Sequence, residues 1–124
     1  MLQNKDSSAI VAVRDIAAAR RFYVATLGLE PLTETSDMLV LKTGGTQLVV
    51  YVSSFAGTNQ ANAVAWGVGG DIETIVSDLR GKGVAFEHYP DMPGNYADGI
   101  HSAGEFKAAW FKDPDGNILH INNM

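Results

Sequence analysis

The residues best suited to chemistry in this chain are its three histidines, His88, His101 and His120, which all lie in its C-terminal third. An imidazole titrates close to neutral pH, so a histidine that lines a cleft can act as a general acid or base. No carboxylate is visibly paired with His120 in the sequence, and a lone histidine on a final strand is more often a hydrogen-bonded lining residue than a ligand. We therefore expect His120 to line a site. Acid–base catalysis by His120, assisted by His101 or Glu105, is kept as a hypothesis.

Other kinds of chemistry are excluded by what the sequence lacks. There is no cysteine, so the chain has no disulfide, no thiolate metal site and no cysteine nucleophile. No serine lies in a nucleophile-elbow motif. The glycines Gly67, Gly69 and Gly70 do not continue into a dinucleotide-binding fingerprint. The candidate chemistry is thereby limited to histidines and carboxylates.

The composition is that of one soluble globular domain. With 124 residues the chain can bury a sizeable core, and its 46% apolar and 19% charged residues are typical of a water-soluble protein. The net charge is −5, and no basic cluster stands out beyond Arg20-Arg21, so we expect no nucleic acid and no anionic membrane as a partner. No apolar run could span a bilayer and Met1–Ser8 are polar, so we expect a cytoplasmic protein.

Two stretches of the chain predict β-hairpins in the same frame. The later one has apolar runs on both sides of Asp113-Pro114-Asp115-Gly116-Asn117, whose proline and glycine suit the corners of a tight turn. The earlier one has apolar runs around residues 43–46. Aligning Lys42 with Lys112 and Gly45 with Gly116 also places Val49 on His120. The chain therefore contains an internal duplication.

Each predicted hairpin follows a strand and a helix. In the first half these are a strand over 9–13, a helix from the N-cap Asp15 to a glycine end at Gly28, and strands over 29–32, 38–42 and 47–53. In the second half they are a strand near 64–68, a helix over 72–79 after the cap Asp71, a strand over 84–89, a glycine-rich loop over 89–105 and the final hairpin. We therefore expect an α+β fold of two tandem βαβββ modules, about 8–54 and 63–124, with a linker over about 55–62.

These motifs together resemble one known family. The combination of Arg21-Phe22-Tyr23, Leu27-Gly28-Leu29 and the hairpin from Phe111 to Asn117, in a duplicated frame, resembles the vicinal oxygen chelate superfamily. That superfamily includes glyoxalase I, extradiol dioxygenases, fosfomycin-resistance enzymes and bleomycin-resistance proteins. The resemblance covers nearly the whole chain. It implies sheets curled around a central cleft, and a homodimer that is either side by side or exchanges modules.

The resemblance also implies where a metal would be held. Enzymes of the superfamily typically hold a divalent metal with up to four His, Glu or Gln side chains, from the first and last strand of each module. The matching positions here are Ser8, Val49, Ala63 or Val64, and His120. Only His120 is an ordinary transition-metal ligand, and a tight site needs about three protein ligands. We therefore expect no cofactor and no bound metal; the alternative is a divalent metal with His120 as one ligand.

The strand periodicity predicts the lining of the cleft. Alternate residues share a face, so Gln47, Val49 and Tyr51 point one way, as do Ile118 and His120. We expect these residues and Trp110 to line the cleft, with Ile10 beside them, and Tyr96 and His101 to reach it from the 89–105 loop, which is either a lid or a solvated connection. The extra glycine in Gly69-Gly70 makes the register of the preceding strand ambiguous, so the sequence does not decide whether Trp66 faces the cleft or the helix.

Such a pocket, apolar and aromatic with a few polar anchors, suits a small aromatic or amphipathic organic molecule. The first interpretation is therefore a metal-free small-molecule binding protein of this superfamily. The second is a glyoxalase-type lyase or isomerase, either metal-dependent or based on His120. A purely structural domain is the third, and no sequence feature favours it.

Overall fold

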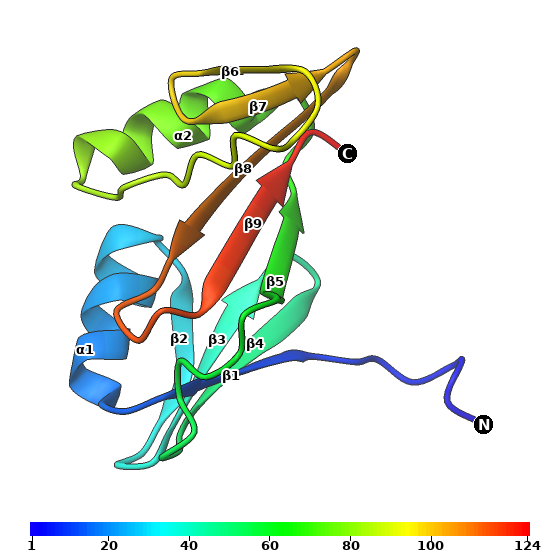
Figure 1. The fold of residues 1–124 in the computed structure, drawn as a ribbon. Coiled ribbons are helices and arrows are strands. Elements are labelled where there is room, and N and C mark those ends of the chain that lie inside the picture. The colour runs from blue at the N-terminus through cyan, green and yellow to red at the C-terminus, as the bar shows by residue number, and fades with distance from the viewer.

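The computed structural model describes residues 1–124 and consists of two β-sheets, each covered by one helix on the same side of the molecule (Figure 1). The first sheet has the strand order β1-β4-β3-β2 and the second β5-β9-β8-β7-β6. β1 runs parallel to β4 and β5 runs parallel to β9, while the remaining pairs are antiparallel. The expected α+β fold of two tandem βαβββ modules is confirmed, with one strand more in the second module.

The strands of the first module are β1 (Ala9–Val13), β2 (Glu30–Glu34), β3 (Met38–Thr43) and β4 (Thr46–Val52). Those of the second module are β5 (Asn62–Gly67), β6 (Asn95–Ala97), β7 (Ile100–Ala103), β8 (Phe106–Lys112) and β9 (Ile118–Asn122).

The first helix begins where the sequence predicts. Asp15 accepts a hydrogen bond from the Ala17 N–H at 3.0 Å, the N-cap geometry that satisfies a free donor of the first turn. α1 (Ile16–Arg20) then widens into a π-helical segment, η1 (Arg21–Thr26), and the chain leaves it through Gly28 at φ +78°. Glycine suits this left-handed conformation because it lacks a Cβ.

The second helix, α2 (Ile72–Gly81), follows a short 3₁₀ turn, η2 (Gly69–Asp71). Its predicted apolar face is confirmed, since Ile72, Val76 and Leu79 are buried. The predicted cap is wrong in one respect: the Asp71 side chain makes no capping hydrogen bond. Its backbone, at φ −87° and ψ 3°, already belongs to the 3₁₀ turn and lacks the extended conformation of an N-cap.

The predicted strand over 84–89 and the predicted loop over 89–105 are both wrong in part. Within 84–89 only Phe86 bridges to Phe111, and the Glu87 N–H donates to the Trp110 carbonyl at 2.8 Å. Beyond it the chain forms the β6–β7 hairpin, which pairs with the first half of β8. Its turn, Asp98-Gly99, has φ +53° and +87°, the type I′ geometry favoured in two-residue hairpins. The outer edge of β8 is therefore covered by two separate pieces of chain.

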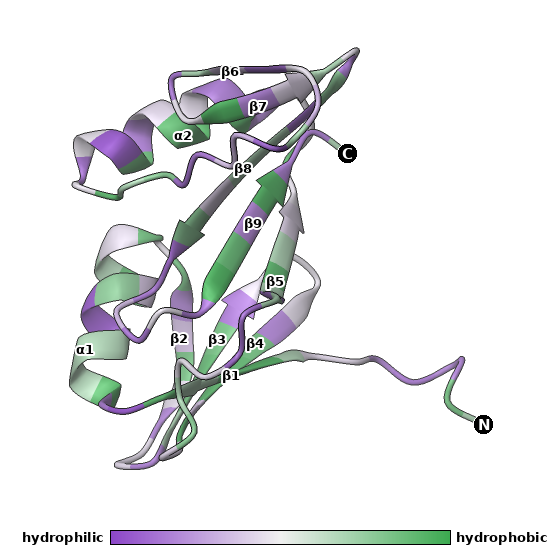
Figure 2. Ribbon diagram, in the orientation of Figure 1, coloured by the Kyte–Doolittle hydropathy of each residue, from purple (hydrophilic) through white to green (hydrophobic).

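The paired strands of the two long hairpins correspond position for position, although the second turn is one residue longer. Toward the helices the pairs Leu41–Leu48 and Leu39–Val50 correspond to Phe111–Leu119 and Ala109–Ile121. Toward the opposite, open side the pairs Val40–Val49 and Met38–Tyr51 correspond to Trp110–His120 and Ala108–Asn122. The predicted alignment of Val49 with His120 is confirmed by this register. Figure 2 shows the alternation of apolar and polar residues along β9.

One hydrogen-bonded carboxylate joins the final turn to the first module. Asp113, which is 5% exposed, accepts hydrogen bonds from the Tyr23 hydroxyl at 2.8 Å and from the Asn117 side-chain amide at 2.8 Å. Its other oxygen accepts from the backbone N–H groups of Asp115 and Asn117, at 3.0 and 2.9 Å. The Asn117 amide also donates to the Ala12 carbonyl at 2.7 Å. The Asp-Pro-Asp-Gly-Asn turn therefore holds the two modules together as well as closing a hairpin.

Candidate functional site

The open face of the first sheet is apolar and exposed. Ile10 and Met38 are 61% and 42% exposed, and Tyr51 is 37% exposed. Ile10 and Val49 are register partners on β1 and β4, and Val40 is the partner of Val49 on β3. The predicted common face of Gln47, Val49 and Tyr51 is confirmed by this register. Gln47 itself lies at the rim of this face, beside the β3–β4 turn.

The open face of the second sheet carries a chain of aromatic and imidazole rings in place of those aliphatic side chains. Trp110 stacks on His120 with ring centroids 4.6 Å apart. The edge of Trp110 meets His101 at 5.3 Å, and His101 lies 4.6 Å from Tyr96. We call this set the ring cluster; it comprises the following residues: His88, Tyr89, Tyr96, His101, Trp110 and His120.

Two members of the ring cluster were not anticipated from the sequence. His88 stacks on Tyr96 with centroids 4.1 Å apart, and Tyr89 meets the edge of Trp110 at 5.4 Å. Both come from the segment that was expected to be a strand, and its irregular path turns them toward the open face. Tyr96 and His101 lie on β6 and β7 instead of a loop, so the lid interpretation fails for them.

His101 is held in one protonation pattern by the backbone. The side chain is 5% exposed, and its Nε2 atom lies 3.0 Å from the Tyr89 N–H, which can only donate. Nε2 is therefore the acceptor, and the proton of neutral His101 is on Nδ1. The Nδ1 atom is buried and has no hydrogen-bond partner.

His120 has the same pattern for a different reason. The Oδ1 atom of Asn122 accepts the Met124 N–H at 3.1 Å, so the amide nitrogen of Asn122 is the atom 3.1 Å from His120 Nε2. This nitrogen donates to Nε2, which places the proton of neutral His120 on Nδ1. That Nδ1 atom is also buried without a partner, although the residue is 8% exposed overall.

Burial favours the neutral form of both rings. It lowers the pKa of His101, and the neighbouring His88 lowers it further because two charged imidazoles would repel each other; the backbone of Tyr89 partly opposes these two effects. Burial also lowers the pKa of His120, an effect that the backbone of Ala109 partly opposes. At neutral pH the cluster therefore presents two uncharged N–H donors among aromatic rings. Buried donors are rarely left unpaired in proteins, so each is a point where an acceptor atom would be stabilised.

The predicted single cleft is divided in the structure. The sheets meet through β1 and β5 and stay separate, so the residues of β4 and the ring cluster occupy two adjoining open faces. None of the four main cavities contains Val49, Tyr51, Trp110 or His120. Ile118, half-buried, lies at the start of β9 between the two groups. Within one chain the structure thus brings together Trp110, His120, His101 and Tyr96, and leaves Gln47, Val49 and Tyr51 apart from them.

The positions where the family holds a metal do not fit one. Ser8 precedes β1, Val49 contacts aliphatic residues, and Val64 faces the helix side as the partner of the buried Leu119. Ala63, the other candidate, has no donor atom. No group of three or more His, Cys, Asp or Glu side chains lies together anywhere in the chain. His120 would be a single ligand, and the absence of a resident metal stays a prediction.

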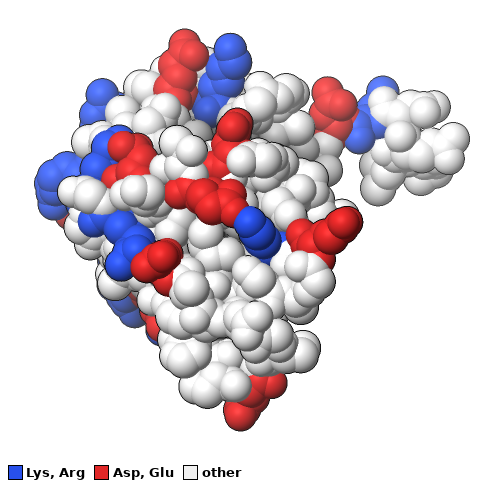
Figure 3. All heavy atoms as spheres, turned by 90° about the horizontal axis from the view of Figure 1, so that it is seen from above, with Lys and Arg blue, Asp and Glu red and all other residues white.

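On the face shown in Figure 3, Lys and Arg side chains are interspersed with Asp and Glu side chains. Over the whole molecule, six ion pairs join basic and acidic side chains, including Arg14–Asp115 across the two modules at 3.3 Å. No helix is long and apolar enough to cross a membrane.

Solved structures share this architecture from end to end. A glyoxalase family protein from Enterococcus faecalis superposes with a TM-score of 0.74 at 23% identity, over 98% of this chain and 99% of that one. A glyoxalase/bleomycin resistance protein/dioxygenase from Alicyclobacillus acidocaldarius gives 0.74 at 18% identity, over 96% and 90%. A lactoylglutathione lyase from Agrobacterium tumefaciens gives 0.73 at 14% identity, over 98% and 95%. At these identities the likeness establishes the fold alone.

Sequence comparison assigns the family. No curated protein sequence is significantly similar to the chain. The family model of the glyoxalase/bleomycin resistance protein/dioxygenase superfamily, however, matches residues 7–121, which is nearly the whole chain and both modules. The expected resemblance is confirmed, and the chain belongs to the glyoxalase/bleomycin resistance protein/dioxygenase superfamily.

Proposed function

We propose that this protein binds a small planar aromatic molecule at the ring cluster, without a tightly bound metal. The observation that carries the proposal is the pair of buried, unpartnered Nδ1 atoms of His101 and His120 among stacked rings. Aromatic walls favour a flat ligand, and two neutral N–H donors favour one that bears acceptor atoms such as carbonyl oxygens. A cationic ligand is disfavoured because these donors offer it no acceptor.

The proposed ligand must enter beside the outer segment of the second module. Trp110 is half-buried and His88 is exposed, whereas His101 is enclosed. No main cavity opens at the cluster, so the ligand would displace part of the 90–93 segment and leave the Tyr89 N–H on His101 in place. This segment has two prolines and makes few backbone hydrogen bonds to β8, so moving it disrupts little of the sheet.

A homodimer is part of the proposal. The open face of the first module exposes Ile10, Met38 and Tyr51, which water solvates poorly. In a dimer, this face of one copy would cover the ring cluster of the other and complete the site with Gln47, Val49 and Tyr51, beside Ile118 of the copy that carries the ring cluster. Light scattering at micromolar concentration is the direct test, and a monomer would contradict this part.

Two related probes test the binding proposal. 1,4-Naphthoquinone and naphthalene have the same ring system, but only the quinone has carbonyl acceptors, and the chain has no cysteine with which a quinone could react. Each hydrogen bond contributes about 0.5–1.5 kcal/mol, so we expect the quinone to bind about 2- to 13-fold more tightly per imidazole donor engaged. Quenching of Trp110 fluorescence in a Trp66→Phe background measures both affinities.

The substitution His120→Phe keeps a ring against Trp110 and removes the N–H donor. We expect it to weaken quinone binding and to leave naphthalene binding unchanged. Equal affinity for the two probes in the unmodified protein, or equal losses for both probes in His120→Phe, would contradict the role of the imidazole donors.

The lyase interpretation receives no support from the geometry. A proton-transfer role for His120 needs a partner that tunes or orients the ring, and the only side chain bonded to it is the amide of Asn122. Turnover of a hemithioacetal, with or without added Ni²⁺ or Zn²⁺, would nevertheless overturn the binding proposal.

A further inference from the structure

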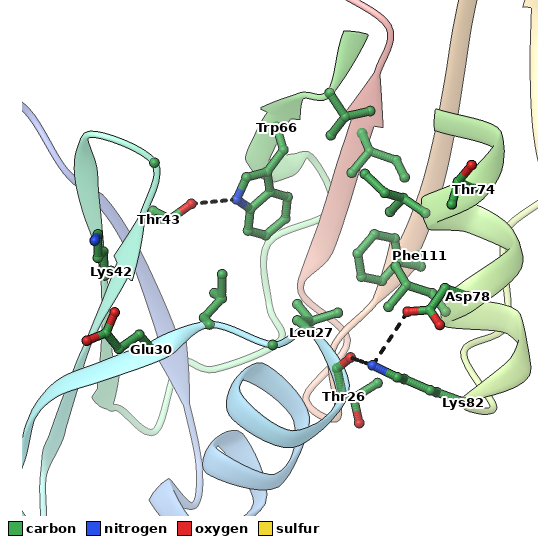
Figure 4. A pocket seen from close by; sticks show the side chains of 17 residues that line it. Thr26, Leu27, Glu30, Lys42, Thr43, Trp66, Thr74, Asp78, Lys82 and Phe111 are labelled. Atoms are coloured by element: carbon green, nitrogen blue, oxygen red, sulfur yellow. Dashed lines mark hydrogen bonds and ion pairs between the residues drawn. The ribbon is translucent and has the colours of Figure 1, made fainter. Parts of the chain in front are cut away.

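The largest of the four main cavities lies away from the ring cluster, on the helix side, between the two modules (Figure 4). It is an open groove of about 660 Å³, within the range of small-molecule sites. One wall is formed by residues 26–30, after the first helix, and by the β3–β4 turn; the other is formed by α2. Both modules therefore contribute to it, and module interfaces are frequent places for ligands.

The floor of the groove is apolar and incompletely covered. Leu27, Leu29, Trp66 and Ile75 pack at the edge of the core but remain partly exposed, while Phe111 beneath them is buried. The sequence alone does not decide on which face of its strand Trp66 lies. In the structure Trp66 is the register partner of Ile121, which places Trp66 on the helix side, in this groove. A molecule lying there would remove these side chains from water.

Trp66 is held in place by its polar atom. The indole N–H donates to the Thr43 hydroxyl at 2.8 Å, and this bond joins β5 of the second module to the end of β3 in the first. Since the N–H is already satisfied, Trp66 offers the groove only its ring surface. Trp66 can therefore give an apolar or aromatic ligand a ring surface to pack against, but it cannot donate a hydrogen bond to that ligand.

The rim charges are balanced. At one end, the Lys82 ammonium group bonds the Thr26 carbonyl at 3.3 Å and lies 3.5 Å from the Asp78 carboxylate (Figure 4). At the other end, Glu30 and Lys42 are cross-strand partners on β2 and β3. Each end has one acidic and one basic group, so neither an anion nor a cation would find an uncompensated counter-charge.

We propose that this groove is a second ligand site, distinct from the ring cluster, for an apolar ring-containing molecule without net charge. The ligand would lie on Trp66 and the leucines, with any polar end at the rim. Because it would contact both modules, it would also stabilise their packing against each other.

The probes for the test are N-phenyl-1-naphthylamine, which is neutral, and 8-anilino-1-naphthalenesulfonate, which adds a sulfonate to the same rings. The site is located by ¹H–¹⁵N spectra of the labelled protein, in which the indole signals of Trp66 and Trp110 are assigned with Trp66→Phe and Trp110→Phe. We expect saturable shifts at the Trp66 indole and at the amides of residues 27–30 and 75. The sulfonate should bind at least about tenfold more weakly, a difference of about 1.4 kcal/mol.

A matched pair of substitutions on α2 completes the test. Thr74 is exposed and lines the groove, whereas Ser77 is exposed on the same helix and does not line it. Thr74→Phe should fill the mouth and weaken the neutral probe about tenfold, and Ser77→Phe should not. Both variants should melt like the parent because the sites are on the surface. Shifts centred on Trp110 or His101, equal affinity for both probes, equal effects of the two substitutions, or no saturable binding would each overturn the proposal.

Discussion

The hydrogen bond from Tyr23 to Asp113 is expected to be one of the main stabilising contacts between the modules, and Tyr23→Phe tests it. Tyr23 is fully buried, and its hydroxyl donates to the Asp113 carboxylate at 2.8 Å. The substitution removes one hydroxyl and leaves the ring in the core, against Phe22 at 5.1 Å. Asp113 keeps its three other donors, so the carboxylate is not left bare.

A hydrogen bond to a charged group contributes about 1.5–3 kcal/mol, and we expect the free energy of unfolding to fall by about that amount. The entropy of unfolding at about 2.1 cal/mol/K per residue, over 124 residues, is roughly 0.26 kcal/mol/K. The melting temperature should therefore drop by about 6–12 °C. Urea denaturation at pH 8 measures the free energy, and Tyr51→Phe, at an exposed position, should change it by less than about 0.5 kcal/mol.

The same pair of proteins gives a second, independent readout at alkaline pH. Burial raises the pKa of Tyr23 far above its ordinary value, and the Asp113 charge raises it further. In the unfolded chain this phenol ionises near pH 10, so above that pH the unfolded state binds fewer protons than the folded state and stability falls with pH. The folded state keeps Tyr23 protonated, so the loss continues at roughly 1.4 kcal/mol per pH unit.

Phenylalanine cannot ionise, and the other titrating groups are common to both proteins. The difference in stability between the parent and Tyr23→Phe should therefore be constant up to about pH 10 and shrink above it. A difference below about 0.5 kcal/mol at pH 8, or a difference that does not shrink between about pH 10 and 11, would refute the reasoning.

Three further predictions concern other parts of the molecule. Burial lowers the folded-state pKa values of His101 and His120 below their unfolded value of about 6.5. As the pH falls, the unfolded chain therefore takes up more protons than the folded one, and stability should decline below about pH 6.5. His120→Phe should flatten this decline in a series of urea denaturations at different pH values. Gly57→Ala should destabilise the protein by more than about 1 kcal/mol, since a Cβ at φ +75° would collide with the Asp115 carbonyl, whereas Gly70→Ala, with open space around it, should be tolerated in thermal melts. Elemental analysis of purified protein should find substoichiometric zinc, nickel and iron, and a chelator should leave ligand binding unchanged; a stoichiometric metal would contradict the ligand count.

The two corresponding β-hairpins could be predicted because the residues that specify them are neighbours in the sequence. Pro114 and Gly116 specify a turn through their own φ angles, and alternation along each run specifies which residues share a face. The register of Trp110 with His120 follows from those two facts alone, and the structure has that pairing. Asp98-Gly99 is an equally local hairpin signal, but it lies inside a glycine-rich segment whose composition predicts a loop.

The segment over 84–89 shows where local reasoning stops. Its alternation of Val84 and Phe86 favours a strand, but a strand also needs a neighbour with free hydrogen-bonding groups. β7 pairs with the first half of the outer edge of β8, and from the 84–89 segment only Phe86 and Glu87 pair with the remainder. Which segment takes the edge is decided by the whole second module, so the positions of His88 and Tyr89 in the ring cluster could not be read from spacing.

The partners of the imidazole nitrogens are equally non-local. Whether the proton of neutral His101 is on Nδ1 depends on the backbone N–H of Tyr89, which donates to Nε2 from a different segment of the chain. For His120 it depends on an amide that is oriented by the Met124 backbone. The sequence identified both histidines as candidate lining residues; it could not say that each would keep one buried donor.

The two open faces explain why one chain alone does not enclose a ligand. The pairs that face the helices are apolar in both modules, because each module needs a core there. On the open side, the pair Val40–Val49 is aliphatic and the pair Trp110–His120 is aromatic and polar, while β1 and β5 hold the two faces side by side. An aliphatic face exposed to water destabilises the protein unless another surface covers it. A buried N–H donor likewise destabilises the protein unless an acceptor pairs with it. A second copy that lays its aliphatic face over a ligand on the rings would satisfy both requirements, whereas closure within one chain would require the contact between β1 and β5 to break.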